Sequence, residues 1–353
     1  MKKTHTISFL LITLSFLIIS CNDYSVSPKP PIEIDSADIY DWTVIPFPGY
    51  LEGLFVADSN NIFINASFYK PLFYNGTTIK EIELNDPNFK ITTLDGFNKY
   101  NVIFGGGIQV AHADPIIKKW TNGNISSFTI INDSGTYIGD ILMVGPDQAW
   151  ISSAGENKIY YFNSGSFTRY LLDDSVQGGR FYKNHAGQIF VFGLYVENRN
   201  PGPVFIMLYT YKFYNGQFRL ILRDSLYPHS DKTDYLLKCG NEMFMITHPD
   251  PFDELYRFNG SNWEYYITAP EMISNVGGIS KDYFVVFCAS SLSVYIWNGN
   301  WRKEDSLKFP TYPPFYSLAS SSIVIKDQNV YFTAEDFGDE SFFIMGRKKN
   351  KTR

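Results

Sequence analysis

Tyr74-Asn75-Gly76 is the first of six similar turns in the chain, each of which places an aromatic residue shortly before a glycine. The others are Trp120-Thr121-Asn122-Gly123, Phe162-Asn163-Ser164-Gly165, Tyr214-Asn215-Gly216, Phe258-Asn259-Gly260 and Trp297-Asn298-Gly299. Asn-Gly is the strongest short signal for a β-hairpin, because both central residues of a type I′ turn need a positive φ and these two residues tolerate it best. The chain is therefore predicted to be a repeat of β-hairpins.

The spacing of these turns indicates the size of the repeat. Their glycines lie 47, 42, 51, 44 and 39 residues apart, which fits one four-stranded propeller blade per repeat. A second unit, a polar turn followed by an apolar strand, occurs seven times. These apolar strands begin at Ile62, Val102, Ala149, Ile189, Met243, Phe284 and Val330. We expect each repeat to run strand a, polar turn, strand b, variable loop, strand c, glycine turn, strand d. Seven blades fit best, with six or eight as the alternatives.

The seventh copy of the repeat lacks its outermost strand. After Phe342-Phe343-Ile344-Met345 the sequence runs into Gly346 and a basic tail, so no residues remain for a strand d. Near the other end of the chain, Trp42-Thr43-Val44-Ile45 resembles the openings of strand d at Trp263 and Trp301. We predict that this N-terminal strand closes the ring, because closure removes an edge that would invite aggregation.

These hairpins resemble those of the β-propeller superfamily, and in particular those of seven-bladed bacterial lipoproteins with an aromatic-Asn-Gly turn between strands c and d. The resemblance covers about residues 40–349. It implies an all-β fold, a seven-bladed β-propeller of four-stranded antiparallel blades closed by an N-terminal strand. It does not imply one activity, because propellers include enzymes, lectins and scaffolds. The Trp-Asp ending of WD40 repeats and the Ser-x-Asp-x-Gly-x-Thr-Trp box of sialidases are absent from the sequence.

The first 20 residues have the form of a secretory signal, with Lys2 and Lys3 ahead of an apolar run that ends at Ile19. The sequence Ile18-Ile19-Ser20-Cys21 resembles the lipobox of bacterial lipoproteins, in which the cysteine is acylated and becomes the mature N-terminus. An ordinary signal peptide with an incidental cysteine is the alternative. Because several acyl chains anchor a protein durably, we expect Cys21 to hold the protein on a lipid bilayer.

The expected organisation follows from this N-terminus. Residues 1–20 are the lipoprotein signal peptide, residues 21–39 are the lipidated cysteine and a flexible tether rich in proline, residues 40–349 are the propeller, and residues 350–353 are a frayed tail. The expected location is the bacterial cell envelope, at the outer membrane, facing either the periplasm or the cell surface.

Composition narrows the class of function. The chain has 353 residues, a net charge of −6 and no basic excess, so nucleic acid is not an expected partner. Aromatic residues make up 17% of it, which suits packing between sheets, with sugar-stacking surfaces as the alternative. We expect Cys239 and Cys288 to be buried free thiols, with a disulfide between them as the alternative. No cysteine has the spacing of a metal or redox site.

The loops that join strands b to c, and one blade to the next, gather around the central channel on one face of a propeller. Here these loops are long and irregular, whereas the turns of the opposite face are short, so we expect ligands to bind on the first face. The candidate ligand-binding residues in these loops are His112, Asp114, Glu197, Arg199, His229, His248, Asp250 and Asp336. None of them forms a pattern diagnostic of catalysis or of metal ligation, so we assign no catalytic residue, metal or cofactor.

We therefore expect a monomeric, membrane-anchored extracytoplasmic lipoprotein that acts as a non-catalytic binding or scaffold module. Its expected partners are the lipid bilayer, through acylated Cys21, and a protein or glycan of the cell envelope. The alternative is a carbohydrate-active enzyme, either a glycoside hydrolase or a polysaccharide lyase, that uses the loops at the channel. The acidic loops and the aromatic surplus favour this alternative.

Overall fold

The computed structural model describes residues 34–67, 70–108, 115–130, 137–173, 176–198, 204–226, 236–247, 252–288, 291–308, 319–335 and 340–349. Within these ranges every regular element is a β-strand, as the hairpin repeat predicts. The same ranges contain no helix that is long and apolar enough to cross a membrane. The predicted signal peptide, Cys21 and the tail at 350–353 lie outside the described residues.

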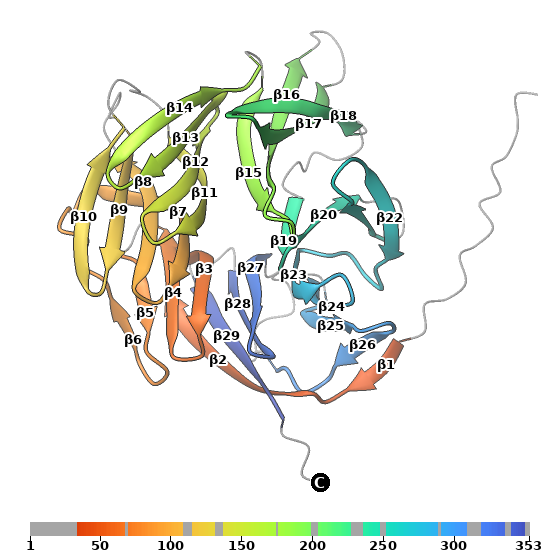
Figure 1. The fold of residues 1–353 in the computed structure, drawn as a ribbon. Helices are drawn as coiled ribbons and strands as arrows, with labels where there is room; N and C mark the ends of the chain where they lie inside the picture. The colour runs from red at the N-terminus through yellow and green to blue at the C-terminus, as the bar shows by residue number, and fades with distance from the viewer. Residues whose placement is uncertain are drawn as a thin grey trace, which may run out of the picture. The chain divides into compact units, whose positions relative to one another are not determined.

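Seven sheets form a ring around a central axis (Figure 1). Each sheet is one blade, in which four strands follow one another from the axis outward. The innermost strands are β3 (Tyr50–Asp58), β7 (Phe89–Asn98), β11 (Tyr137–Gly145), β15 (Gln177–Lys183), β19 (Leu236–Cys239), β23 (Asn275–Ser280) and β27 (Ala319–Lys326). The second strands are β4 (Asn61–Ser67), β8 (Asn101–Ile108), β12 (Gln148–Ala154), β16 (Ile189–Asn198), β20 (Glu242–Thr247), β24 (Tyr283–Cys288) and β28 (Asn329–Glu335).

Two further sets of strands complete the blades. The third strands are β5 (Leu72–Tyr74), β9 (Ile116–Thr121), β13 (Lys158–Asn163), β17 (Val204–Tyr214), β21 (Glu254–Phe258), β25 (Ser293–Trp297) and β29 (Glu340–Lys348). The outer strands are β6 (Ile79–Glu81), β10 (Asn124–Thr129), β14 (Ser166–Leu171), β18 (Gln217–Leu226), β22 (Trp263–Thr268), β26 (Trp301–Glu304) and, in blade 7, β2 (Tyr40–Pro48). The predicted seven-bladed propeller of four-stranded antiparallel blades is therefore confirmed.

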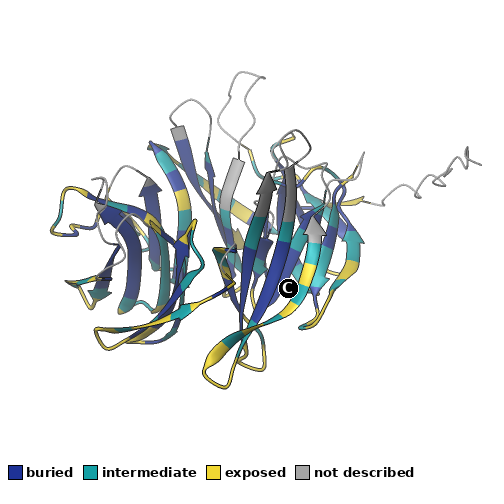
Figure 2. Ribbon diagram, turned by 90° about the horizontal axis from the view of Figure 1, so that it is seen from above, coloured by how far each residue is buried: buried dark blue, intermediate teal, exposed yellow. Residues whose placement is uncertain are grey.

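Aromatic side chains hold neighbouring blades together. Between blades 1 and 2, the ring centroids of Phe63 and Trp120 lie 5.9 Å apart in an edge-to-face arrangement. Between blades 5 and 6, the Phe244 and Phe284 centroids are 5.5 Å apart, and both side chains are fully buried. Figure 2 shows buried residues along the middle of the blades and exposed residues at the hairpin turns. Much of the aromatic surplus is therefore packing between sheets, as expected.

The six aromatic-glycine turns all connect the third strand of a blade to its outer strand, as predicted, but they do not share one conformation. Asn122, Ser164 and Asn215 have φ near +50° and precede a glycine that also has a positive φ, as a type I′ turn requires. In the turns of blades 1 and 5 the loop is longer. There, the side-chain oxygens of Asn75 and Asn259 accept backbone N–H groups two and three residues ahead. The type I′ prediction thus holds for three of the six turns.

The N-terminal strand closes the ring, as predicted. Strand β2 pairs antiparallel with β29 over its whole length, from Tyr40 opposite Lys348 to Pro48 opposite Glu340. Trp42 lies opposite Gly346, and a Cβ atom on that glycine would lie 2.6 Å from the Trp42 ring. A glycine is therefore required there for the tryptophan to cover the last blade.

A second N-terminal strand extends the closure beyond what was predicted. Strand β1 (Ile34–Ala37) joins blade 6 as a fifth strand, parallel to β26, with Ile34 opposite Trp301 and Ala37 opposite Glu304. The Glu304 carboxylate accepts the Ile39 N–H at 3.0 Å, between the two N-terminal strands. The part of the expected tether from Ile34 onward is thus strand and turn. Its sequence has no apolar period because it pairs through backbone groups on a free sheet edge.

The two cysteines among the described residues are free and buried, as expected. Cys239 lies on the innermost strand of blade 5, and Cys288 lies on the second strand of blade 6. Burial raises the pKa of both thiols, Cys239 and Cys288, well above the usual range. They therefore behave as small apolar side chains of the core.

Deletion of residues 40–48 is expected to lower the melting temperature by about 10 °C or more, because blade 7 loses its outer strand and β29 becomes an open edge. Differential scanning calorimetry measures this change. A chain that begins at residue 38 loses β1 alone and is the control, for which we expect a smaller decrease. An unchanged transition after the first deletion would contradict the closure.

Candidate functional site

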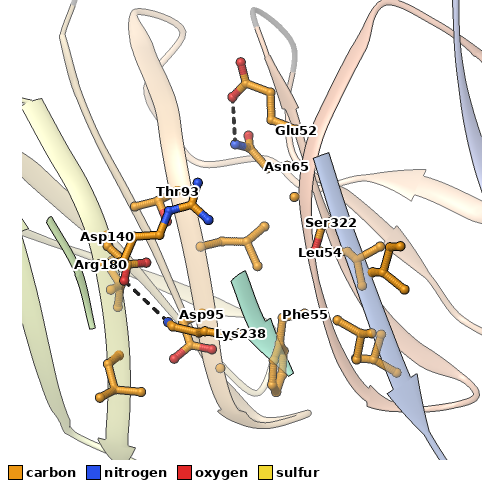
Figure 3. Close-up of a pocket in the computed structure, with 18 of the residues that line it drawn as sticks. Glu52, Leu54, Phe55, Asn65, Thr93, Asp95, Asp140, Arg180, Lys238 and Ser322 are labelled. Carbon is orange, nitrogen blue, oxygen red and sulfur yellow. Dashed lines mark hydrogen bonds and ion pairs between the residues drawn. The ribbon is translucent and has the colours of Figure 1, made fainter. Parts of the chain in front are cut away.

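A channel of about 700 Å³ lies at the centre of the ring and is lined by residues from all seven innermost strands (Figure 3). It is the place where side chains from every blade converge. Propellers concentrate their binding residues around this axis, so the channel is the candidate functional site of this chain.

Bulges in the innermost strands direct side chains into the channel. In five blades, an irregularity in the pairing of the first two strands falls just before one residue of the innermost strand. These residues are Gly53, Thr93, Asp140, Arg180 and Ser322, and all five line the channel. A bulge bends its strand and re-aims the side chain beside it. In four of these blades the irregularity therefore brings a polar or charged side chain to the channel wall, and in blade 1 it brings Gly53.

Carboxylates cover part of the free edges inside the channel. Each innermost strand has a partner on one side only, so its other edge presents unpaired backbone groups. Asp95 of blade 2 accepts the N–H of Met143 in blade 3 at 2.8 Å, and Asp140 of blade 3 accepts the N–H of Phe181 in blade 4 at 2.7 Å. The two aspartates thus join successive blades and also place negative charge on one side of the channel.

Positive charge comes from the next two blades, 4 and 5. Lys238 of blade 5 extends to Asp140, with its Nζ atom 3.4 Å from Oδ2 (Figure 3). Arg180 of blade 4 is exposed within the lining of the channel and donates one hydrogen bond, to the Leu236 carbonyl at 2.9 Å. A guanidinium has five N–H donors, and among the described residues Arg180 has no carboxylate partner. Its remaining donors are available to a ligand.

The pKa of Asp95 is raised above the usual value of an aspartate. Burial raises its pKa to about 6, against the opposing effects of the Lys238 charge and the Met143 N–H. The charge of Asp140 raises it further. Asp95 therefore titrates just below neutral pH, and the charge of the channel changes there.

A further carboxylate, that of Glu52, lies at another part of the lining. Asn65 donates from Nδ2 to the Glu52 carboxylate at 3.2 Å, as Figure 3 shows. Burial, followed by the charge of Glu52, raises the pKa of Glu335 at the end of β28. Across the part of the chain that the structure describes, no group of three His, Cys, Asp or Glu side chains is placed to hold a metal ion.

The loop residues expected to bind ligand cannot be compared with this geometry. The backbone of Glu197 is part of β16 and pairs with Phe205, but its side chain is outside the described residues. The positions of His112, Asp114, Arg199, His229, His248, Asp250 and Asp336 also lie outside them. These eight assignments stay predictions.

Sequence reasoning missed the six charged residues of the channel lining, four of which come from blades 2 to 5. Asp95, Asp140, Arg180 and Lys238 all lie on innermost strands, where most neighbours are apolar or glycine. A charged residue inside an otherwise apolar strand is a signal that it faces something other than a packed sheet. That signal, read across the repeats, would have pointed to the channel wall instead of the loops.

Comparison with known proteins supports the fold alone. No family model matches the sequence, and no curated protein matches it. The solved structure of YCF48 bound to D1 peptide has a TM-score of 0.60 with 10% identity, covering 90% of this chain and 100% of that one. The β-propeller domain of Cps50 (Swd1) from Myceliophteria thermophila has a TM-score of 0.57 with 9% identity, covering 88% and 99%. The WD40 propeller of Doa1 has a TM-score of 0.55 with 10% identity, covering 88% and 97%.

These comparisons establish the chain as a β-propeller. At such low identity they carry no residue of a binding site from one protein to another. The similarity to a WD40 domain coexists with the absence of the Trp-Asp ending, so that ending is not needed for this ring.

Asp95→Asn is expected to remove a pH dependence of stability. The folded protein binds the Asp95 proton more tightly than the unfolded chain, so this residue lowers the free energy of unfolding as pH rises from about 4 to about 6. Asparagine keeps an oxygen for the Met143 N–H and carries no charge. The variant should match the wild type near pH 4 and exceed it by up to about 2 kcal/mol at pH 7. Urea unfolding at both pH values measures this, and equal differences at both would contradict it.

Proposed function

We propose that this chain is a lipid-anchored, non-catalytic binding module of the bacterial cell envelope, which holds a partner protein or glycan at its central channel. The observation that carries the proposal is the guanidinium of Arg180, which lies in the channel lining, donates one hydrogen bond and has no carboxylate partner among the described residues. Arginine binds carboxylates through two parallel N–H donors. The partner group is therefore a carboxylate, which an acidic protein segment or an acidic sugar can supply.

The rest of the channel is a preformed site, whose residues are ordered before a ligand binds. Most lining residues come from strands, and Asp95 and Asp140 of the lining already accept backbone N–H groups of neighbouring blades. A site held this way loses little entropy when it binds. YCF48, which has a similar fold, has been solved with a bound peptide, and this favours a protein partner for the present chain.

The proposed location depends on the N-terminal sequence. The lipobox-like Ile18-Ile19-Ser20-Cys21 precedes a proline-containing segment that leads to β1 at Ile34. In this proposal the acyl chains on Cys21 hold the propeller at the outer membrane, and the residues between Cys21 and β1 separate it from the bilayer.

Cys21→Ser is expected to release the protein from the membrane, because the acyl chains are then not attached. Expression in a Gram-negative host, followed by fractionation and mass spectrometry of the mature N-terminus, measures this. The wild type should enter the membrane fraction with an acylated cysteine, and the variant should not. Recovery of an unmodified Cys21 in the wild type would overturn the anchor.

Arg180→Gln is expected to weaken partner binding about tenfold or more, because a charge-assisted pair is replaced by a neutral hydrogen bond. Capture from envelope extracts and a glycan array, both with purified full-length protein, supply the partner and the affinity. Lys183→Gln is the matched control, since Lys183 is an exposed cation on the same strand outside the channel lining. Equal binding by both variants and the wild type would contradict a role for the channel.

The alternative of a carbohydrate-active enzyme has one specific observation in its favour. Glu335 has a raised pKa and the charge of Glu52 acts on it, and carboxyl pairs whose pKa values are driven apart serve as acid and base in glycoside hydrolysis. Release of reducing ends from a polysaccharide by the wild type, with loss in Glu335→Gln and not in Arg180→Gln, would favour this function over the binding module.

A further inference from the structure

The face opposite the long loops also carries a pocket, although its turns are short. It has a volume of about 370 Å³ and lies among the turns that join the first two strands of blades 1 and 2, beside the end of β27. Phe55 and Lys326 line both this pocket and the channel, so the pocket adjoins the channel at its turn-face end. Arg180 is not part of it.

Two aromatic rings are exposed at this pocket. Phe97 is 48% exposed and Tyr100 is 50% exposed, whereas most large aromatics of the propeller are buried between sheets. The Phe55 ring forms a floor, and it lies so close to Gly96 that a Cβ there would be 2.1 Å from the ring. Exposed rings that contribute nothing to the core commonly mark an interaction site.

The turn that carries these rings is rigid. The Asn98 side-chain oxygen accepts the Tyr100 N–H at 2.9 Å and the Asn101 amide at 3.0 Å. From the neighbouring hairpin, the Asn122 N–H donates to the Tyr100 carbonyl at 2.9 Å. Both backbone groups of Tyr100 are therefore fixed, so the turn that carries its ring is ordered before binding.

Blade 1 has the same turn without the aromatic residues. There Asp58 accepts the Asn60 N–H at 2.9 Å and the Asn61 amide at 2.8 Å, as Asn98 does in blade 2. By position in the two turns, Ala57, Ser59 and Asn60 correspond to Phe97, Lys99 and Tyr100. The turn itself does not need the rings or the lysine, so their presence in blade 2 has another cause.

The pocket is also positively charged, on a protein whose net charge is −6. Lys99 lies over the Tyr100 ring, with Nζ 5.3 Å from its centroid, and Lys326 is exposed at the rim. Neither lysine has an ion pair among the described residues. Asp58 supplies the single carboxylate of the lining and leaves one excess positive charge.

We propose that this pocket binds a peptide segment of a partner protein in which a large apolar residue stands next to acidic residues. The apolar side chain lies on Phe97, Tyr100 and Phe55, and the acidic side chains meet Lys99 and Lys326. This assignment rests on charge complementarity and on the small number of free polar groups. The Asn98 amide oxygen and the Asp58 Oδ1 atom are engaged by their own turns, whereas a sugar needs several fixed polar groups to read its hydroxyls.

The test is selection of a random peptide library displayed on phage against the immobilised full-length protein, followed by titration of the enriched peptide. The expected consensus combines Asp or Glu with Phe, Tyr, Trp or Leu. Binding should weaken about tenfold or more in Phe97→Ala and in Tyr100→Asn, because aromatic anchors carry most of the affinity of such contacts. It should also weaken with added salt and in Lys99→Ser.

Three of these variants carry the residue that blade 1 already has at the same turn position, so the turn is retained. Tyr214→Asn is the matched control, because Tyr214 is 54% exposed with Arg219 over its ring, but lies at an outer hairpin away from the pocket. This control should bind as the wild type does. A basic or neutral consensus, no enrichment, or enrichment unaffected by Tyr100→Asn would overturn the proposal. Glycan-array binding that Tyr100→Asn abolishes would assign the pocket to a sugar and overturn it equally.

Discussion

The pairing of β2 with β29 is the interaction on which the rest of the structure depends. Each of the first six blades completes itself within one stretch of chain, but blade 7 ends at its third strand. Nine consecutive backbone pairings from the start of the chain complete it. Strand β1 pairs in parallel with β26 of blade 6. Residues 34–48 therefore span the junction between the last two blades. The ring resists opening because its seam is covered by two strands from one segment.

Ring closure also determines the geometry of the channel. Asp95, Asp140, Arg180 and Lys238 come from blades 2, 3, 4 and 5, and they meet only because the innermost strands converge on one axis. Carboxylates that bond backbone N–H groups of the next blade stabilise that convergence and set the charge pattern at the same time. The same hydrogen bonds therefore hold neighbouring blades together and position the charged residues of the proposed binding site. The positively charged aromatic pocket at the turn face lies between blades 1 and 2, and it shares Phe55 and Lys326 with the channel.

The repeat, the blade number and the closing strand could be predicted because each is written in local sequence. Turns with glycine, apolar second strands and a missing last strand are features of a few residues each. The strand β1 could not be predicted, since Ile34-Asp35-Ser36-Ala37 has no apolar alternation and pairs only through its backbone with a free edge. The longer turns at Asn75 and Asn259 differ from type I′ because their side chains cap the loop, which depends on residues beyond the Asn-Gly pair.

The channel residues illustrate a different limit of sequence reasoning. Loop length drew attention to histidines and carboxylates between strands, whereas the described site is built from single charged residues inside strands. Whether Asp140 or Arg180 faces the channel depends on a bulge one or two residues earlier, and a bulge shifts the alternation of faces by one. Residues far apart in sequence then become neighbours through the curvature of the ring, which no local pattern records.

Hydrogen exchange of the mature protein, followed by mass spectrometry, tests the closed ring most directly. If β2 is an integral strand of blade 7, those amides of residues 40–48 that face β29 exchange as slowly as the amides of 340–348, since both sets are released only when the whole ring unfolds. Rapid exchange of residues 40–48, with β28 and β29 still protected, would show that the ring is stable without β2. That result would contradict the proposed role of β2 in ring closure.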